Sequence, residues 1–112
     1  MCSMNSLNGV PACANRPLFA LLRGAWASDA VVQTDCCDSL STAVDQLHYY
    51  GTLEDAVADA MHAGLQGLFT TDPHAGVAAL GAAVESGKVP GACEHTKRAY
   101  EASKASVLEL AR

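Results

Sequence analysis

Residues 29–34 read D-A-V-V-Q-T, and this stretch decides the fold class. It is short, mostly apolar and rich in β-branched residues, which is typical of a strand buried within a sheet. The stretch ends at Asp35, where the chain turns polar. A second stretch at residues 65–70, L-Q-G-L-F-T, is also expected to form a strand, weakened by Gly67.

Helices are expected between and beyond these strands, because apolar residues recur at helical spacing and turn or cap residues bound them. Asn8-Gly9 marks a turn ahead of the first helix. That helix should carry Leu18, Leu21, Leu22 and Trp26, with Trp26 in the core. Pro17 marks the start of this first helix. The second is expected to begin at Thr52, with Glu54 and Asp55 in its first turn, and to end at Gly64; the third is expected to begin at Asp72-Pro73 and to end at Gly87. A last helix is expected over residues 94–111.

Strands that alternate with helices of these lengths predict right-handed βαβ units and a parallel sheet. Two or three parallel strands are too few to close a domain of this kind, since both faces and both edges of the sheet need cover. The fold class is therefore expected to be α/β, as a partial (β/α)₈ TIM barrel of roughly the last three strands and their helices.

Composition excludes several classes of protein. The chain has 112 residues, which fits one small domain, and 50% of them are hydrophobic, too many for a disordered chain. Lys and Arg number 7 against 12 Asp and Glu, so the net charge is −5 and we expect no nucleic-acid partner. We also expect no membrane partner, because no apolar run approaches the roughly 18 residues of a span.

Five cysteines leave the redox chemistry open. None forms a Cys-x-x-Cys motif, and Cys36 and Cys37 are adjacent, so a metal site is not expected. A disulfide between Cys2 and Cys13 is compatible with the sequence, but spacing alone does not assign it. The first residues lack a positive and then apolar pattern, so they are not expected to be a secretory signal.

Asp35 is the candidate catalytic group. In α/β barrels such groups lie at the carboxyl ends of strands, where a carboxylate can serve as nucleophile, base or metal ligand. The alternative is that Asp35 or Asp38 merely caps the next turn.

Several motifs resemble the β-xylosidase and arabinofuranosidase branch of glycoside hydrolase family 3. Residues 1–15, M-C-S-M-N-S-L-N-G-V-P-A-C-A-N, resemble its M-C-S-Y-N-x-x-N-G-V-P-x-C-A segment. Residues 22–26 resemble L-R-G-E-W, and residues 31–36, V-V-Q-T-D-C, resemble its V-V-S-D-C. Downstream, His48-Tyr49 with Thr52 resembles H-Y-x-x-T. The likeness covers residues 1–93, and residues 94–112 form a divergent terminal helix.

The resemblance implies a fragment of the family's N-terminal barrel and the retaining hydrolysis of a terminal β-linked sugar, of the xylan 1,4-β-xylosidase type. Asp35 takes the place of the family's nucleophile, and Met4, Asn5, Cys36 and His48 are candidate substrate-binding residues. The implied partner is a carbohydrate, a xylo-oligosaccharide or related β-glycoside, and no cofactor or metal is needed. The rest of the barrel and the domain that carries the acid/base are missing here, and the implied location is extracellular.

The chain also departs from the family pattern. Met4 replaces a tyrosine that packs on the sugar, Thr34 replaces a serine, and Gln66-Gly67 stands where Asp-Leu is usual. Two alternatives stay open beside the enzyme. The short length favours a non-catalytic truncated remnant without activity of its own, and only the cysteines point to a small α/β redox or metal domain.

Overall fold

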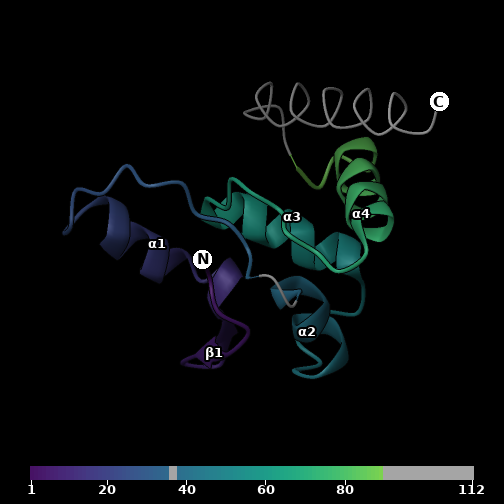
Figure 1. The fold of residues 1–112 in the computed structure, drawn as a ribbon, viewed down its shortest axis with the longest axis horizontal. Helices are drawn as coiled ribbons and strands as arrows, with labels where there is room; N and C mark the ends of the chain where they lie inside the picture. Colours follow the sequence, from purple (N-terminus) through teal and green to yellow (C-terminus); the bar gives the residue numbers. More distant parts are fainter. Residues whose placement is uncertain (36–37, 90–112) are drawn as a thin grey trace.

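The structure of the chain is a computed structural model, and it describes residues 1–35 and 38–89. The last helix expected from the sequence, at 94–111, lies outside the described residues, as do Cys36 and Cys37. Four α-helices, one 3₁₀ helix and one two-stranded sheet make up the described part (Figure 1). None of the helices in these residues is long and apolar enough to cross a membrane.

An antiparallel hairpin opens the chain. Strands β1 (Ser6–Leu7) and β2 (Val10–Pro11) are joined by Asn8 and Gly9, both with positive φ, at 54° and 80°. Such a two-residue turn matches the twist of the strands, and Asn-Gly is its preferred sequence. The turn predicted at this dipeptide is confirmed. The 3₁₀ helix η1 (Ala12–Ala14) follows at once and is buried.

Helix α1 (Arg16–Arg23) begins as predicted. The side chain of Asn15 accepts a hydrogen bond from a backbone N–H of the first turn, and Pro17 lies in that turn. Phe19 is the residue that α1 buries, at 5% exposure, because it packs against the central helix. The prediction that Trp26 belongs to the core is wrong: α1 ends before it, and its side chain is 68% exposed.

Helix α3 (Leu53–Ala63) lies at the centre of the molecule, with α1, α2 and α4 around it (Figure 1). Thr52 caps it by accepting a hydrogen bond from a first-turn N–H, and Gly64 ends it with a φ of 115°. Both ends were predicted from the sequence. Ala56 and Val57 are at most 1% exposed, because the other elements pack against this helix.

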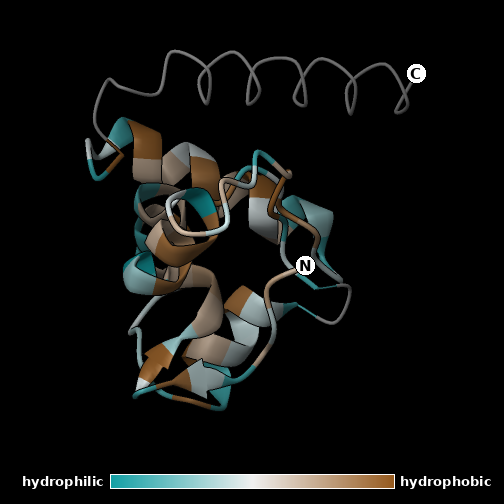
Figure 2. Cartoon of the chain, turned by 90° about the vertical axis from the view of Figure 1, so that its left-hand side faces the viewer, coloured by the Kyte–Doolittle hydropathy of each residue, from teal (hydrophilic) through white to brown (hydrophobic). Residues whose placement is uncertain are grey.

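Two further helices complete the described part. Helix α4 (Pro73–Glu85) starts at the predicted cap, Asp72, whose side chain accepts a hydrogen bond from the N–H of Ala75. Helix α2 (Ser39–Asp45) was not predicted, and it buries Leu40 against α3. Apolar and polar residues alternate along the helices (Figure 2).

The two strands expected at residues 29–34 and 65–70 are not regular strands in the structure. Both segments are extended and lie side by side, with the start of the chain next to them. What remains of the pairing are isolated parallel bridges of Cys2 with Thr34 and of Gln33 with Gly67. Three stretches far apart in sequence are thereby joined in parallel.

Side chains explain why these stretches do not form a longer ladder. The guanidinium of Arg23 donates to the carbonyl of Ala30 at 2.6 Å and to the side-chain oxygen of Gln66 at 2.9 Å. The same Gln66 oxygen accepts from the N–H of Val32 at 3.2 Å. These backbone groups are therefore satisfied by side chains rather than by a neighbouring strand.

Candidate active site

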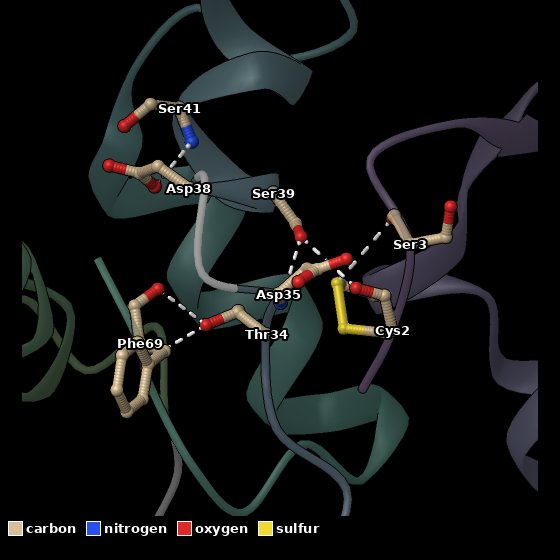
Figure 3. Close-up of a disulfide and its surroundings, with 9 residues drawn as sticks. Cys2, Ser3, Thr34, Asp35, Asp38, Ser39, Ser41 and Phe69 are labelled. Carbon is tan, nitrogen blue, oxygen red and sulfur yellow. Dashed lines mark hydrogen bonds between the residues drawn. A yellow bond between two sulfur atoms is a disulfide. The ribbon is translucent and has the colours of Figure 1, made fainter. Parts of the chain in front are cut away.

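Asp35 ends the extended segment and is half-buried. Its backbone N–H donates to the hydroxyl of Ser39 at 3.1 Å, and its carbonyl accepts from the N–H of Asp38 at 3.3 Å. These two bonds tie Asp35 to the first residues of α2 and its cap. Figure 3 shows Asp35 lying between Ser39 and Cys2, at the point where the parallel segments meet.

Thr34 fixes the segment that carries Asp35. It is fully buried, and its N–H donates to the carbonyl of Gly67 at 3.1 Å. Its hydroxyl donates to the carbonyl of Phe69 and accepts from the N–H of the same residue, both at 2.5 Å (Figure 3). One hydroxyl thus replaces a pair of ladder hydrogen bonds and keeps the segments at 30–35 and 65–70 in register.

The other flank of Asp35 is held by the start of the chain. The N–H of Cys2 donates to the carbonyl of Gln33 at 2.7 Å, and the carbonyl of Cys2 accepts from the hydroxyl of Ser39 at 3.0 Å. Cys2 also forms a disulfide with Cys13, with 5.1 Å between the two Cα atoms. This is the pairing that the sequence left open.

Asp38 has a structural task. Its backbone is left-handed, with a φ of 67°, and its carboxylate accepts from the N–H of Ser41 at 3.1 Å, which caps α2. The hydroxyls of Thr70 and Thr71 donate to its other oxygen at 2.6 and 3.4 Å. Burial acts to raise the pKa of Asp38, but the hydrogen bonds from these three residues outweigh it and hold the pKa below its ordinary value. The capping alternative is thus confirmed for Asp38.

The candidate substrate-binding residues are not all brought together. Met4 and Asn5 lie two and three residues after Cys2 and are exposed, so they lie on the flank of the site that the disulfide anchors. His48 is exposed, has a φ of 49° and lies beyond α2, which begins beside Asp35 and runs away from it. Cys36 lies outside the described residues.

Three further observations concern possible metal ligands, Arg23 and Ser39. Within residues 1–35 and 38–89, no group of three or more His, Cys, Asp or Glu side chains is placed to hold a metal ion. Arg23, whose guanidinium donates to the carbonyls of Ser28 and Ala30, organises the opposite end of the extended segment rather than the site. Ser39 was missed by sequence reasoning, because a lone serine carries no pattern that marks it as a partner of Asp35.

Comparison with known proteins shows similarity to β-xylosidases. No family model matches the chain, and no solved structure does. The chain is 39% identical over 90 residues to β-D-xylosidase 3 of Arabidopsis thaliana, covering 80% of this chain and 11% of that protein. It is 42% identical over 65 residues to the probable β-D-xylosidase 6 of the same plant, 58% of this chain and 8% of that protein.

A fungal protein shows the same likeness. The chain is 39% identical over 67 residues to a probable exo-1,4-β-xylosidase of Aspergillus clavatus, covering 57% of this chain and 8% of that protein. The chain therefore spans about a tenth of the length of the curated relatives it matches. The resemblance to the β-xylosidase branch of glycoside hydrolase family 3 is thus confirmed, and the chain is a β-xylosidase-like segment.

Proposed function

We propose that this chain supplies the nucleophile of a retaining β-glycosidase that releases terminal β-linked xylose, and that Asp35 is that nucleophile. The observation that carries the proposal is the different exposure of two neighbouring aspartates. Asp38 is buried and engaged in capping α2, whereas Asp35 is half-exposed at the end of a segment that is fixed from both sides.

Retaining hydrolysis needs two carboxyl groups about 5–5.5 Å apart. One attacks the anomeric carbon and forms a glycosyl-enzyme, while the other protonates the leaving oxygen and then activates water. Asp35 is suited to the first role, because a nucleophile must be held still and remain open to the substrate. The acid/base would come from a part of the enzyme beyond these 112 residues, as the family resemblance implies.

We further propose that Met4 and Asn5 line the sugar subsite next to Asp35. The Cys2 carbonyl is tied to Ser39, so the residues that follow Cys2 leave from beside the nucleophile. The methionine side chain can cover an apolar sugar face, but it lacks the hydrogen bond of a tyrosine hydroxyl. Cys36 and His48 remain proposals as substrate-binding residues.

The architecture proposed for this site is one arc of a (β/α)₈ barrel. Parallel bridges join the segments around Cys2, Thr34 and Gly67, and helices α3 and α4 lie after or between them, which supports this arrangement. We also propose an extracellular location. The Cys2–Cys13 disulfide supports it, because disulfides persist in oxidising compartments.

A chimera tests the nucleophile. The 90-residue matching segment of β-D-xylosidase 3 would be replaced by the corresponding part of this chain and treated with a dinitrophenyl 2-fluoro-xyloside. Fluorine slows breakdown of the glycosyl-enzyme, and mass spectrometry of peptides then locates the sugar. We expect the label on Asp35, its loss in Asp35→Asn and its retention in Asp38→Asn. A folded chimera labelled on any other carboxylate would refute the proposal.

The alternative is a remnant without activity of its own, and the short span relative to the relatives favours it for the isolated chain. Without an acid to protonate the leaving group, the rate falls by roughly 10²–10⁴-fold. The missing binding residues lower it further. We therefore expect the purified chain not to hydrolyse aryl β-xylosides. Steady turnover that disappears in Asp35→Asn would show that this expectation is wrong.

A further inference from the structure

A short hydrogen-bond relay connects Asp35 to the disulfide. The N–H of Asp35 donates to the hydroxyl of Ser39 at 3.1 Å, and that hydroxyl donates to the carbonyl of Cys2 at 3.0 Å (Figure 3). Ser39 is 3% exposed, so water does not compete for either bond. The second bond spans 37 positions of the sequence, and it joins the start of the chain to the first residue of α2.

The hydroxyl of Ser39 does not cap the helix to which Ser39 belongs. A serine in the first turn of a helix commonly satisfies a free N–H of that turn. In α2 this task belongs to Asp38, whose carboxylate accepts from the N–H of Ser41 at 3.1 Å. Both partners of the Ser39 hydroxyl therefore lie outside α2. The Ser39 hydroxyl therefore links the backbones of Asp35 and Cys2, while the cap of α2 is made by Asp38.

The disulfide determines where the relay ends. The sulfur of Cys2 is bonded to that of Cys13, which is 1% exposed and belongs to η1, and η1 packs against α3. The Cys2 carbonyl, which accepts from the Ser39 hydroxyl, is thus tied through the disulfide to η1 and so to the core helix α3.

We propose that Ser39 is a positioning residue for Asp35 and that the Cys2–Cys13 disulfide keeps this relay in place, so that the candidate active site is sensitive to reduction; the proposal rests on the nucleophile role of Asp35. A dithiol supplies two electrons and two protons: the S–S bond breaks, two thiols form, and the dithiol becomes a cyclic disulfide. Cys2 then keeps the hydrogen bond of its N–H to Gln33 but loses its covalent tie to η1, so its carbonyl is held less firmly as the acceptor of the Ser39 hydroxyl.

The test measures amide exchange in the 112-residue chain, with the other three cysteines replaced by Ala so that reduction acts on one disulfide. In Ser39→Ala, we expect the Asp35 amide to exchange about tenfold faster, the size expected for one hydrogen bond. The amides of α3 should keep their rates. The control is Ser41→Ala, a serine of the same turn that contacts Asp38 and should leave Asp35 unchanged.

Reduction of the disulfide is the second perturbation, and it is applied with and without Ser39→Ala. With Ser39 present, reduction should reproduce the faster exchange at Asp35; in Ser39→Ala it should add nothing there, because one relay carries both effects. Equal effects of reduction in both chains would overturn the proposal. If reduction unfolds the chain, the oxidised Ser39→Ala variant decides: unchanged exchange at Asp35 also overturns it. These rates do not depend on sugar chemistry, so a label on another carboxylate in the chimera would refute the nucleophile and leave the relay standing.

Discussion

Replacing Asp38 separates its structural role from the chemistry of its neighbour. In Asp38→Ala, α2 loses its N-cap, which costs about 1 kcal/mol. It also loses the hydrogen bonds that Thr70 and Thr71 donate to a charged, buried carboxylate, worth about 2 kcal/mol together. Because about 1.4 kcal/mol corresponds to a factor of ten, exchange protection of the α2 amides should fall by about a hundredfold.

Asp38→Asn is the matched control. Asparagine is as good an N-cap as aspartate and tolerates the left-handed backbone at φ 67°, so protection of α2 should fall by less than about tenfold. Native-state hydrogen exchange measures local opening, and it compares α2 with α3 in one experiment. Equal losses in the Ala and Asn variants, or no loss in either, would refute the capping argument.

The carboxylate also gives this effect a pH dependence. Hydrogen bonds hold the pKa of Asp38 below its ordinary value in spite of burial, so near pH 4 the folded chain binds fewer protons at this site than the unfolded one. The stabilisation is complete above the unfolded pKa of about 3.9, and it is lost as the pH falls through the lower folded pKa. Protection of α2 should therefore drop as the pH falls below about 4 in the wild type, and less in Asp38→Asn.

Two further predictions concern the fold. The parallel segments present unpaired edges, so the isolated chain should associate; sedimentation that shows a monomer at every concentration, with a sharp and concentration-independent urea transition, would contradict this. Gly64→Ala should destabilise the chain by about 1–3 kcal/mol, because its φ is 115° and a Cβ would lie 3.1 Å from Phe19. Gly51→Ala, with nothing within 4 Å of the added Cβ, should be near neutral in thermal melts.

Helix ends could be predicted from the sequence because their chemistry is local. Thr52 and Asp72 bond N–H groups three residues on, and Gly64 supplies the left-handed residue that ends α3. Helix α2 was missed for the opposite reason. Its sequence, S-L-S-T-A-V-D, is rich in residues that disfavour helix, and it is held instead by burial of Leu40 and by threonines more than thirty positions away.

The candidate site was predicted only in part, for the same physical reason. Asp35 follows a recognisable apolar stretch, so its position at the end of an extended segment could be expected. The role of Ser39 depends on a carbonyl 37 positions away, and no local pattern reports such a contact. The extended segments were recognised, but not the capture of their backbone groups by Arg23 and Gln66.

The parallel bridges have a consequence for how the chain folds. Each helix closes over a few residues, whereas the contacts of Thr34 with Phe69 span 35 positions and those of Ser39 with Cys2 span 37. The entropy of closing such long loops must be offset before the contacts form, which slows folding. The helices should therefore appear first, and the junction around Asp35 last. A premature disulfide of Cys2 with a cysteine other than Cys13 would keep the start of the chain away from this junction. Completion of oxidative refolding should therefore depend on thiol exchange.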